Sequence, residues 1–576
     1  MESENEHEAL LLLESYEHLR VHPIPYHRLD LKSIRTIPEL TPGEIQMILK
    51  LRSDYPLVTS WEVLEMQLSS EVMEVLRYSV SLNSTSGPAG DIRWRIKAYG
   101  PDDLRWYTRM NYQPEPNIRW ICLTERDPGE DRMLDYLIGG MEVSDRWGFD
   151  KAVLGGYTLR IGHGLSLGGG MPRRKGSDVI GSVWRKRTAA RLNSSSMEHR
   201  GFTGILFMKR WRSHSCTVFG ARTARNGVIE NGIPVLSETG LHQTSLGKIR
   251  RHAVFEDFGG IICRLKQKSV ETEAYFFALS YRERKTGITT GRAPLGGFTI
   301  ETSWCNHESA FDADGNYGGV SVFRWGIANF ELVLAHRYYS PGFYAPFGAG
   351  LSEFGHPDNE RGIYIGMEWN LKDFRIFCYL DVASEVLGNS GYLRGAEELL
   401  SGFRWRPLSG TTLTVRRSAS VREEIRGYEF MGVRYRSALQ TRISRLRVDW
   451  EYRGVPGERY RLRGEWGKIA PLPRGESLSG FQFHCTTEKT LLNNAYCAVG
   501  LCHYRHPDER YVSYVVFMPV PGTLGFIQQR GVGTLWNIRL RYEFRDGVDL
   551  NCCWSQSRRI GHGFRTTFTL QLDIAF

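Results

Sequence analysis

The sequence predicts a mainly β fold, in which a small all-α domain precedes one large, closed, antiparallel transmembrane β-barrel. Three observations predict it. Apolar and polar residues alternate in long runs from about residue 91 to the end of the chain, glycine is abundant (61 of 576 residues), and aromatic residues make up 12%. No run of 18 mostly apolar residues occurs, which excludes membrane-spanning helices. Strands of a membrane barrel need no such run, because their apolar residues alternate with polar ones.

The alternation is clearest in the last 13 residues of the chain. One side of that segment carries Phe568, Leu570, Leu572, Ile574 and Phe576, and polar residues lie between most of them. The same pattern occurs in residues 92–97, 363–372, 445–453, 460–466 and 536–545. The longer of these runs, 363–372, 445–453 and 536–545, exceed the usual strand of roughly five or six residues in a globular protein, and they match the ~9–11 residues of a membrane-spanning strand.

The number of strands follows from the length of the alternating region. Lipid offers no hydrogen bonds to the backbone, so a spanning sheet must close on itself. At a rough 20–25 residues per strand with its connection, residues 91–576 predict roughly 20–24 strands, in an even number. A β-sandwich of this size would divide into modules of about 100 residues. No break in composition marks such modules.

Residues 1–85 form a separate unit by both periodicity and charge. They hold 7 basic and 14 acidic residues, a net charge of −7, whereas the rest of the chain has +17. Thr41, Pro42 and Glu44 make a strong helix start, and apolar residues at helical spacing follow it. The turn-rich segment 84–90 ends this unit, and the predicted domains are therefore 1–85 and 91–576.

Within this unit, residues 29–82 resemble a tandem pair of helix-hairpin-helix motifs. The two hairpin triplets are Glu39-Leu40-Thr41 and Gln67-Leu68-Ser69. DNA-binding members of that class use glycines there to bring backbone N–H groups close to a phosphate. Both triplets lack glycine and the unit is acidic, so nucleic acid is an unlikely partner.

The whole chain resembles a family of predicted bacterial outer-membrane β-barrels that carry such a tandem domain at the N terminus. The resemblance rests on the glycine-rich block 156–168, on the blocks 337–348 and 359–365, and on the last strand. That strand is similar to the C-terminal aromatic strand that the barrel-assembly machinery recognises. The family has no established activity, so the resemblance implies location and architecture only.

Arginine is the informative residue type of the predicted barrel. Six arginines lie opposite an apolar face and are predicted to point into the lumen: Arg445, Arg447, Arg461, Arg463, Arg539 and Arg541. Two interpretations remain open. The arginines pair with acidic residues on neighbouring strands, or they give the lumen a basic field that favours anionic solutes.

No motif predicts an enzyme, a metal site or a cofactor. The segment from Gly164 to Gly168 matches G-x-S-x-G, but no helix follows Ser166 as that nucleophile motif requires. It predicts a crowded bend instead. The ten cysteines show neither a metal-like spacing nor a disulfide framework.

The predicted function is passage of a solute or macromolecule across the bacterial outer membrane, by a channel or by a transport or secretion component with a basic lumen. The small helical domain is predicted to lie on the periplasmic side or to insert into the lumen as a plug. A membrane-anchored scaffold whose helical domain docks a protein is the alternative, and an envelope protein for DNA binding or uptake is the third. The predicted partners are outer-membrane lipid, the barrel-assembly machinery and a periplasmic protein bound to residues 1–85. The acidic start of the sequence lacks the basic region of a signal peptide, which such a location would require.

Overall fold

A computed structural model of the chain describes most of the region from residue 89 onward and scattered parts of what precedes it. The described residues are 19, 24–26, 29, 31–34, 37, 40, 42–55, 58, 61–65, 68, 70–82, 89–100, 103–130, 134–169, 175–184, 189–196, 199, 201–237, 240, 242–388, 393–408, 410–430, 433–454, 458–472, 477–492, 494–506, 511–516, 519–523, 526–545, 547–561 and 563–576.

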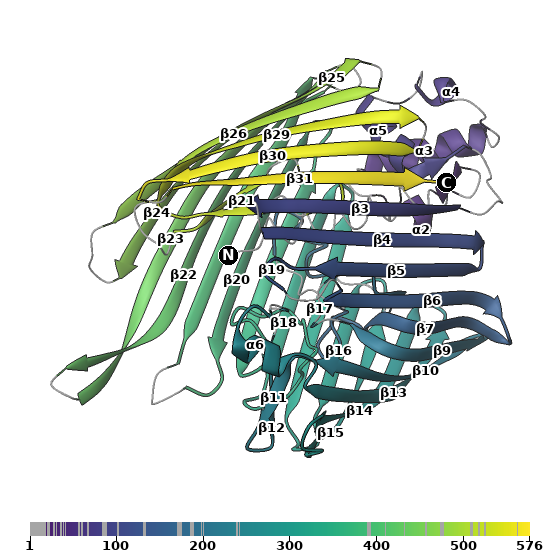
Figure 1. Cartoon of the computed structure of the whole chain (residues 1–576), viewed down its shortest axis with the longest axis vertical. Helices are drawn as coiled ribbons and strands as arrows, with labels where there is room; N and C mark the ends of the chain where they lie inside the picture. The colour runs from purple at the N-terminus through teal and green to yellow at the C-terminus, as the bar shows by residue number, and fades with distance from the viewer. Residues whose placement is uncertain are drawn as a thin grey trace.

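In the described region, 24 antiparallel strands form a closed barrel (Figure 1). A further short strand, β8, shares one position of the ring with β9: β8 pairs with residues 157–160 of β7, and β9 pairs with residues 151–157 of β7. The 24 positions of the ring are therefore filled by 25 strands. The strands are β3 (Ala89–Gly100), β4 (Asp103–Glu115), β5 (Ile118–Arg126), β6 (Tyr136–Arg146), β7 (Phe149–Arg160), β8 (Ala189–Leu192), β9 (Phe202–Trp211), β10 (His214–Arg225), β13 (Val254–Gln267), β14 (Val270–Glu283), β15 (Thr289–Glu301), β16 (Cys305–Phe311), β17 (Tyr317–Ile327), β18 (Phe330–Tyr339), β19 (Glu360–Asn370), β20 (Phe374–Glu385), β21 (Gly395–Leu408), β22 (Thr411–Phe430), β23 (Val433–Arg453), β24 (Arg459–Leu472), β25 (Leu478–Leu492), β26 (Ala495–Arg505), β29 (Val532–Arg545), β30 (Val548–Arg559) and β31 (Phe564–Ala575).

The ring closes where the first barrel strand meets the last. β3 pairs with β31 from Asp91 opposite Ala575 to Ala98 opposite Phe568. Beyond that ladder, the Gly90 N–H donates to the Phe576 carbonyl (2.8 Å) and the Phe576 N–H donates to the Gly90 carbonyl (2.9 Å). The predicted closed antiparallel barrel is confirmed, and its 24 strands are an even number within the expected range. Its first strand in the described residues, β3, begins at Ala89.

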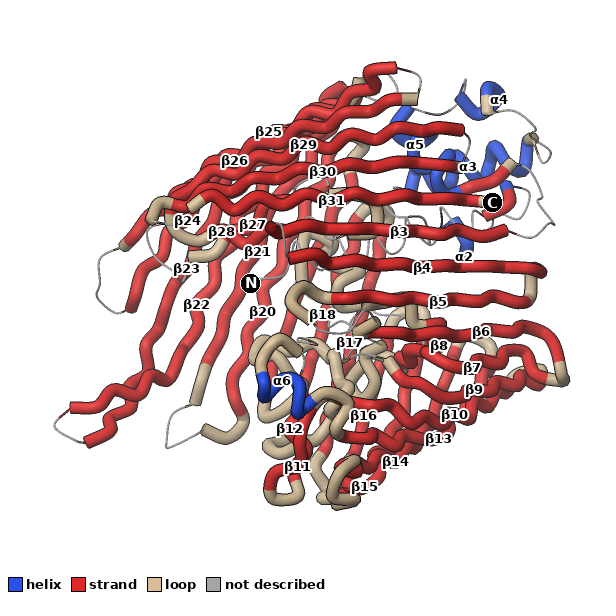
Figure 2. Tube along the Cα trace, viewed as in Figure 1, coloured by secondary structure: helices blue, strands red, loops and turns tan. Residues whose placement is uncertain are grey.

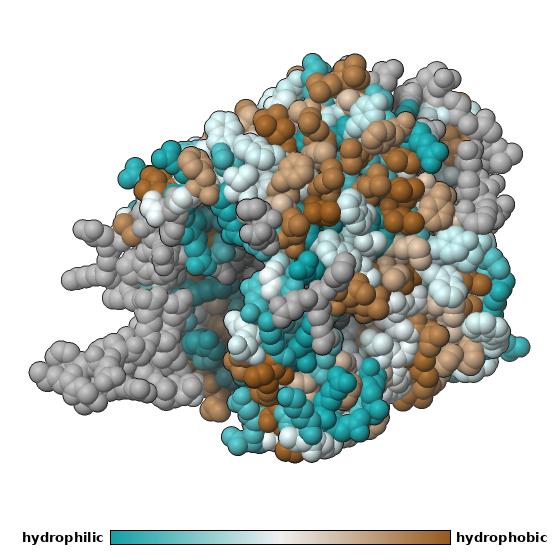
Figure 3. Space-filling model, viewed as in Figure 1, coloured by the Kyte–Doolittle hydropathy of each residue, from teal (hydrophilic) through white to brown (hydrophobic). Residues whose placement is uncertain are grey.

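Side chains alternate between a dry interior and an apolar exterior along the strands. On β19 the side chains of Glu360, Tyr364 and Glu368 are buried, whereas those of Ile365 and Trp369 are 39% and 48% exposed. Apolar residues (brown) are frequent on the outer face of β29–β31 in the view of Figure 3. A globular protein would bury such residues, so this outer face matches a lipid environment.

The two ends of the barrel differ in their connections. At the end where β3 begins and β31 finishes, here called the terminal end, neighbouring strands are joined by short turns such as 116–117, 147–148, 212–213 and 268–269. The opposite end, here called the outer end, has the long connections, drawn partly in tan in Figure 2. Short turns face the periplasm and long loops face the outside in barrels of this class.

The described residues before β3 include four helices and one small sheet. The helices are α2 (Leu31–Ile34), α3 (Pro42–Asp54), α4 (Glu62–Glu65) and α5 (Ser70–Ser79), and β1 (Ile24–Pro25) pairs in parallel with β2 (Val80–Ser81). Their buried apolar side chains, among them Ile34, Ile48 and Leu76, form one cluster. In the described part of the chain, no helix is long and apolar enough to cross a membrane.

A charge placed on the outer face tests its lipid environment. Ile538 lies at the middle of β29 and is 38% exposed. We expect Ile538→Arg to lower the free energy of unfolding by about 2–4 kcal/mol, because arginine at the bilayer midplane is poorly solvated. Urea titration in lipid vesicles measures this change, and Ile538→Leu serves as the apolar control. An arginine variant as stable as the control would place Ile538 in water.

Candidate functional site: a barrel interior filled by its own loops

Two connections of the outer end fold back between the barrel walls. They are the described residues 161–169 and 175–184, which follow β7, and residues 340–359, which join β18 to β19; they are called the inner loops below. Leu167 and Phe347 form a bridge between them, and the Ala349 N–H donates to the Gly164 carbonyl (2.8 Å). Gly164 has φ +81°, and a Cβ at Gly168 would overlap the side chain of Ala349. The glycine-rich block thus permits a close contact between the two loops.

The serine of the G-x-S-x-G segment is part of this contact region. The Ser166 hydroxyl lies 2.8 Å from the Tyr275 hydroxyl, which donates to Glu308 Oε1 (3.1 Å). The Leu165 N–H donates to the other oxygen of Glu308 (3.2 Å). Ser166 and Glu308 are fully buried. These bonds fix the first inner loop to β14 and β16, and they involve no histidine that could act as the base of a serine nucleophile.

Apolar packing holds the inner loops against the wall. Phe347 lies 5.0 Å from Phe202 and 5.4 Å from Phe258 between ring centroids. The Tyr364 hydroxyl of β19 donates to the Val179 carbonyl (2.8 Å). These residues belong to a single cluster of buried side chains from both inner loops and strands β5–β21. This half of the interior is therefore a packed core.

A buried network of ion pairs fixes the same loops to the wall. Lys175 Nζ lies 2.7 Å from Asp381 and 2.8 Å from Glu398, and it also pairs with Glu353 of the other inner loop. Arg337 of β18 lies 2.8 Å from Asp381 and 2.6 Å from Glu360. All of these side chains are at most 7% exposed.

Lys175 is charged in this network although it is buried. Burial alone lowers the pKa of its ammonium group, but the carboxylates of Glu398 and Asp381 outweigh that effect and raise the pKa above its ordinary value. Removing one member of such a buried network is costly, because its partners stay buried without compensation.

The six arginines predicted to point into the lumen all have partners in the structure. Two bond to the connection between β26 and β29: Arg445 donates to the Val512 carbonyl (2.8 Å) and Arg539 to the Pro519 carbonyl (2.9 Å). The other four pair with carboxylates, namely Arg447 with Glu465, Arg461 with Glu451 (3.1 Å), Arg463 with Asp449, and Arg541 with Asp549 (2.8 Å). The pairs join neighbouring strands, as one of the two interpretations expects. The other, an anion-favouring lumen, stays a prediction.

The connection between β26 and β29 also enters the interior. It contains a two-stranded sheet of β27 (Ser513–Val516) and β28 (Phe526–Gln529). The Ser513 hydroxyl bonds to Gln482 of β25 and lies 3.1 Å from His506 Nε2. Burial lowers the pKa of His506 to about 4, although Glu465 acts in the opposite direction. His506 is therefore neutral at pH 7.

The remaining sequence-predicted positions lie away from the interior or outside the described residues. Phe568 and Phe576 are 46% and 57% exposed on the outer side of β31, with Leu570, Leu572 and Ile574 half-buried beside them. Their recognition by the assembly machinery stays a prediction. Of the hairpin positions, Leu40 and Leu68 are described, whereas Glu39, Thr41, Gln67 and Ser69 lie outside the described residues.

The ion-pair network predicts a local effect of removing its lysine. We expect Lys175→Met to release the first inner loop, because three buried carboxylates lose their shared cation at a cost of about 3–5 kcal/mol. Hydrogen exchange of residues 161–184 measures the release. Arg222→Met is the matched control: its pair with Asp257 (2.5 Å) is exposed to solvent, and an exposed ion pair contributes little to stability. Equal exchange in both variants would contradict this role.

Because burial lowers the pKa of His506, we expect acid to loosen the docking of the hairpin of β27 and β28. A released histidine binds a proton below its ordinary pKa of about 6.5, whereas the buried one does so only near 4. The stability of the docked hairpin should therefore be constant above about pH 6.5 and fall as the pH drops toward 4. Hydrogen exchange of residues 511–516 at pH 7 and 4.5 measures it. His506→Gln should remove that pH dependence, and an unchanged dependence in this variant would assign it to another group.

No protein-family model and no curated protein matches the sequence. Similar solved structures include pyoverdine-bound FpvA of Pseudomonas aeruginosa (9% identity, 85% of this chain and 72% of that chain, TM-score 0.42). The FrpB iron transporter of Neisseria meningitidis (8%, 86% and 82%, TM-score 0.41) and the ferric-catecholate import receptor Fiu of E. coli (10%, 86% and 83%, TM-score 0.39) are others. This chain's own closed ring of 24 strands with an apolar outer face is that of a bacterial outer-membrane β-barrel.

Proposed function

We propose that the protein carries an anionic solute across the outer membrane along the arginine-rich wall of β22–β24, with the inner loops as the gate. One observation carries this proposal. On the inward side of β23 and β24, the guanidinium groups of Arg453, Arg459 and Arg461 all pair with the carboxylate of Glu451, at 2.7, 2.7 and 3.1 Å, and Arg459 also lies 4.0 Å from Glu488 of β25.

The excess of positive charge extends along this wall. Several arginines point inward along the described parts of β22, β23 and β24, among them those at 416, 445, 447, 453, 459, 461 and 463. The carboxylates that point inward beside them on these strands are Asp449, Glu451 and Glu465. Registers set this arrangement: Arg447 lies opposite Arg416 on one side and Glu465 on the other. The arginines named here outnumber the three carboxylates, so this part of the wall keeps a net positive charge.

A net positive wall inside a barrel favours anions for a physical reason. The surrounding lipid and protein have a low dielectric constant, so the field of the arginines is concentrated in the lumen rather than screened. Rings or rows of arginine select anions in other pores by the same effect. Guanidinium groups also bind carboxylates and phosphates through paired hydrogen bonds, which makes a carboxylated or phosphorylated solute the best match.

The inner loops suit the role of a gate. They are joined to the wall by side-chain contacts, and the chain on either side of them enters a strand. A segment held in this way can change between a docked and a released arrangement without disturbing the ladder of the barrel. The ion pairs of Lys175 are the contacts whose loss would release the first inner loop.

We also propose that residues 1–85 form a helix-hairpin-helix domain at the periplasmic end, where it would bind a protein partner. The helices of residues 31–79 and their own apolar cluster support a separate unit. In Figure 1 the helices α3 and α5 lie near the terminal end of the barrel, where β3 begins. The acidic charge of this domain favours a basic protein surface over nucleic acid.

Conductance in a planar bilayer tests the transport proposal. We expect the full-length protein to conduct weakly and Lys175→Met to conduct more, because the first inner loop is released. In a KCl gradient the reversal potential of the Lys175→Met protein should indicate anion preference. When Arg459→Gln and Arg461→Gln are added to the Lys175→Met protein, the reversal potential should shift toward cation preference, since the wall loses two positive charges.

The control for this experiment is Arg222→Gln, whose side chain lies on the outer face of β10. It should leave the reversal potential unchanged. Cation preference of the Lys175→Met protein, or no conductance by any of these proteins, would overturn the proposed function.

A further inference from the structure

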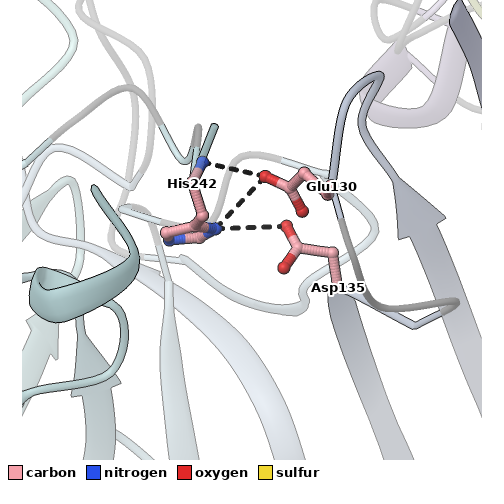
Figure 4. Close-up of side chains that lie close together, drawn as sticks. All are labelled: Glu130, Asp135 and His242. Atoms are coloured by element: carbon pink, nitrogen blue, oxygen red, sulfur yellow. Dashed lines mark hydrogen bonds and ion pairs between the residues drawn. The ribbon is translucent and has the colours of Figure 1, made fainter. Parts of the chain in front are cut away.

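Two connections of the outer end meet through a buried group of three polar side chains (Figure 4). Glu130 and Asp135 lie on the connection between β5 and β6. His242 lies on the connection between β10 and β13, just before helix α6 (Ser245–Arg250). All three side chains are at most 4% exposed. One ligand atom from each residue can be chosen so that all three atoms lie within 4.8 Å of one another.

Local sequence explains why the three side chains converge. Pro128 and Gly129, the latter with φ +71°, form the turn that directs the chain to Glu130. Gln243, next to His242, donates to the Pro128 carbonyl (2.7 Å) and so fastens the second connection to this turn. The backbone N–H of His242 donates to Glu130 Oε1 (2.9 Å). Two hydrogen bonds between side chains and backbone therefore join the two connections next to the group.

The separations of the polar atoms match the ligand shell of a small divalent cation. His242 Nδ1 lies 3.3 Å from Glu130 Oε1 and 3.4 Å from Asp135 Oδ2. Zinc bonds to nitrogen and oxygen are about 2.0–2.2 Å long, so neighbouring ligand atoms in a tetrahedral shell lie about 3.3–3.5 Å apart. One histidine and two carboxylates are a donor set that zinc accepts, and a water molecule can complete it.

Two further observations point to a cation rather than to ion pairing alone. Glu130 Oε2 is buried without any hydrogen-bond partner in the described part of the chain, which is costly for a carboxylate oxygen. Arg251, which follows α6, lies 2.6 Å from Asp135 Oδ1. It thereby holds the carboxylate with its other oxygen, Oδ2, toward His242, as outer-shell partners of metal ligands commonly do.

We propose that Glu130, Asp135 and His242 bind a Zn²⁺ ion that links these two connections at the outer end of the barrel. The ion bonds to His242 Nδ1 and to one oxygen of each carboxylate, and binding requires all three groups in their deprotonated forms. Because the ligands lie on connections that are distant in sequence, the bound ion restrains both of them. The site is separate from the arginine wall and does not depend on the proposed transport function.

Zinc binding to the full-length protein in detergent tests the site. After metal removal and addition of ZnCl₂, the folded protein should retain one zinc per chain through gel filtration. We expect His242→Asn and Glu130→Gln to lose that zinc or to bind it at least tenfold more weakly. Added zinc should also slow hydrogen exchange of residues 242–250 in the unmodified protein, and it should not do so in the His242→Asn variant.

His214→Asn is the matched control, because His214 is exposed at the other end of the barrel. It should bind zinc as the unmodified protein does. Cobalt in place of zinc should give the intense visible absorption of a four-coordinate site. Failure of the unmodified protein to retain zinc, or equal retention by His242→Asn in a barrel that stays folded, would overturn the proposal and leave an ion-pair contact only.

Discussion

The structure depends on one constraint, which is that backbone N–H and C=O groups find no hydrogen-bond partner in lipid. An open sheet would leave one row of these groups at each edge. Here the edges are joined, because β3 pairs with β31 over eight residue pairs from Asp91 to Ala98. The strands then present one side to lipid and the other to the interior, and charged side chains at the depth of the lipid are stabilised on the inner side.

A ring of this size encloses more space than the side chains of its wall can fill. The interior is filled differently in the two halves of the barrel. The inner loops, with Leu165, Val179 and Phe343, make a packed core against β5–β21. The wall of β22–β24 instead carries arginines and carboxylates in register. Packing and polar function are thus separated around the ring, and both rely on the same closed ladder.

The barrel could be predicted from the sequence because the alternation of apolar and polar residues that marks a strand is visible within a short stretch of chain. Strict alternation, as at Ile363 to Trp369, identifies a strand with one apolar side regardless of where the strand lies. The interior could not be predicted in the same way. Lys175 meets Glu353, Asp381 and Glu398 only after the chain folds back, and no spacing records that contact. The histidine and carboxylates of the outer end were missed for the same reason: His242 is far along the chain from Glu130, and sequence spacing alone predicted no metal site.

Closure is the central claim, and hydrogen exchange of the two joining strands in lipid nanodiscs tests it most directly. If β3 and β31 are paired, amides of residues 91–98 and 568–575 should exchange as slowly as those in the middle of the ring, for example in β19. Exchange within seconds in either segment, with slow exchange in β19, would show an open edge and contradict the closed barrel.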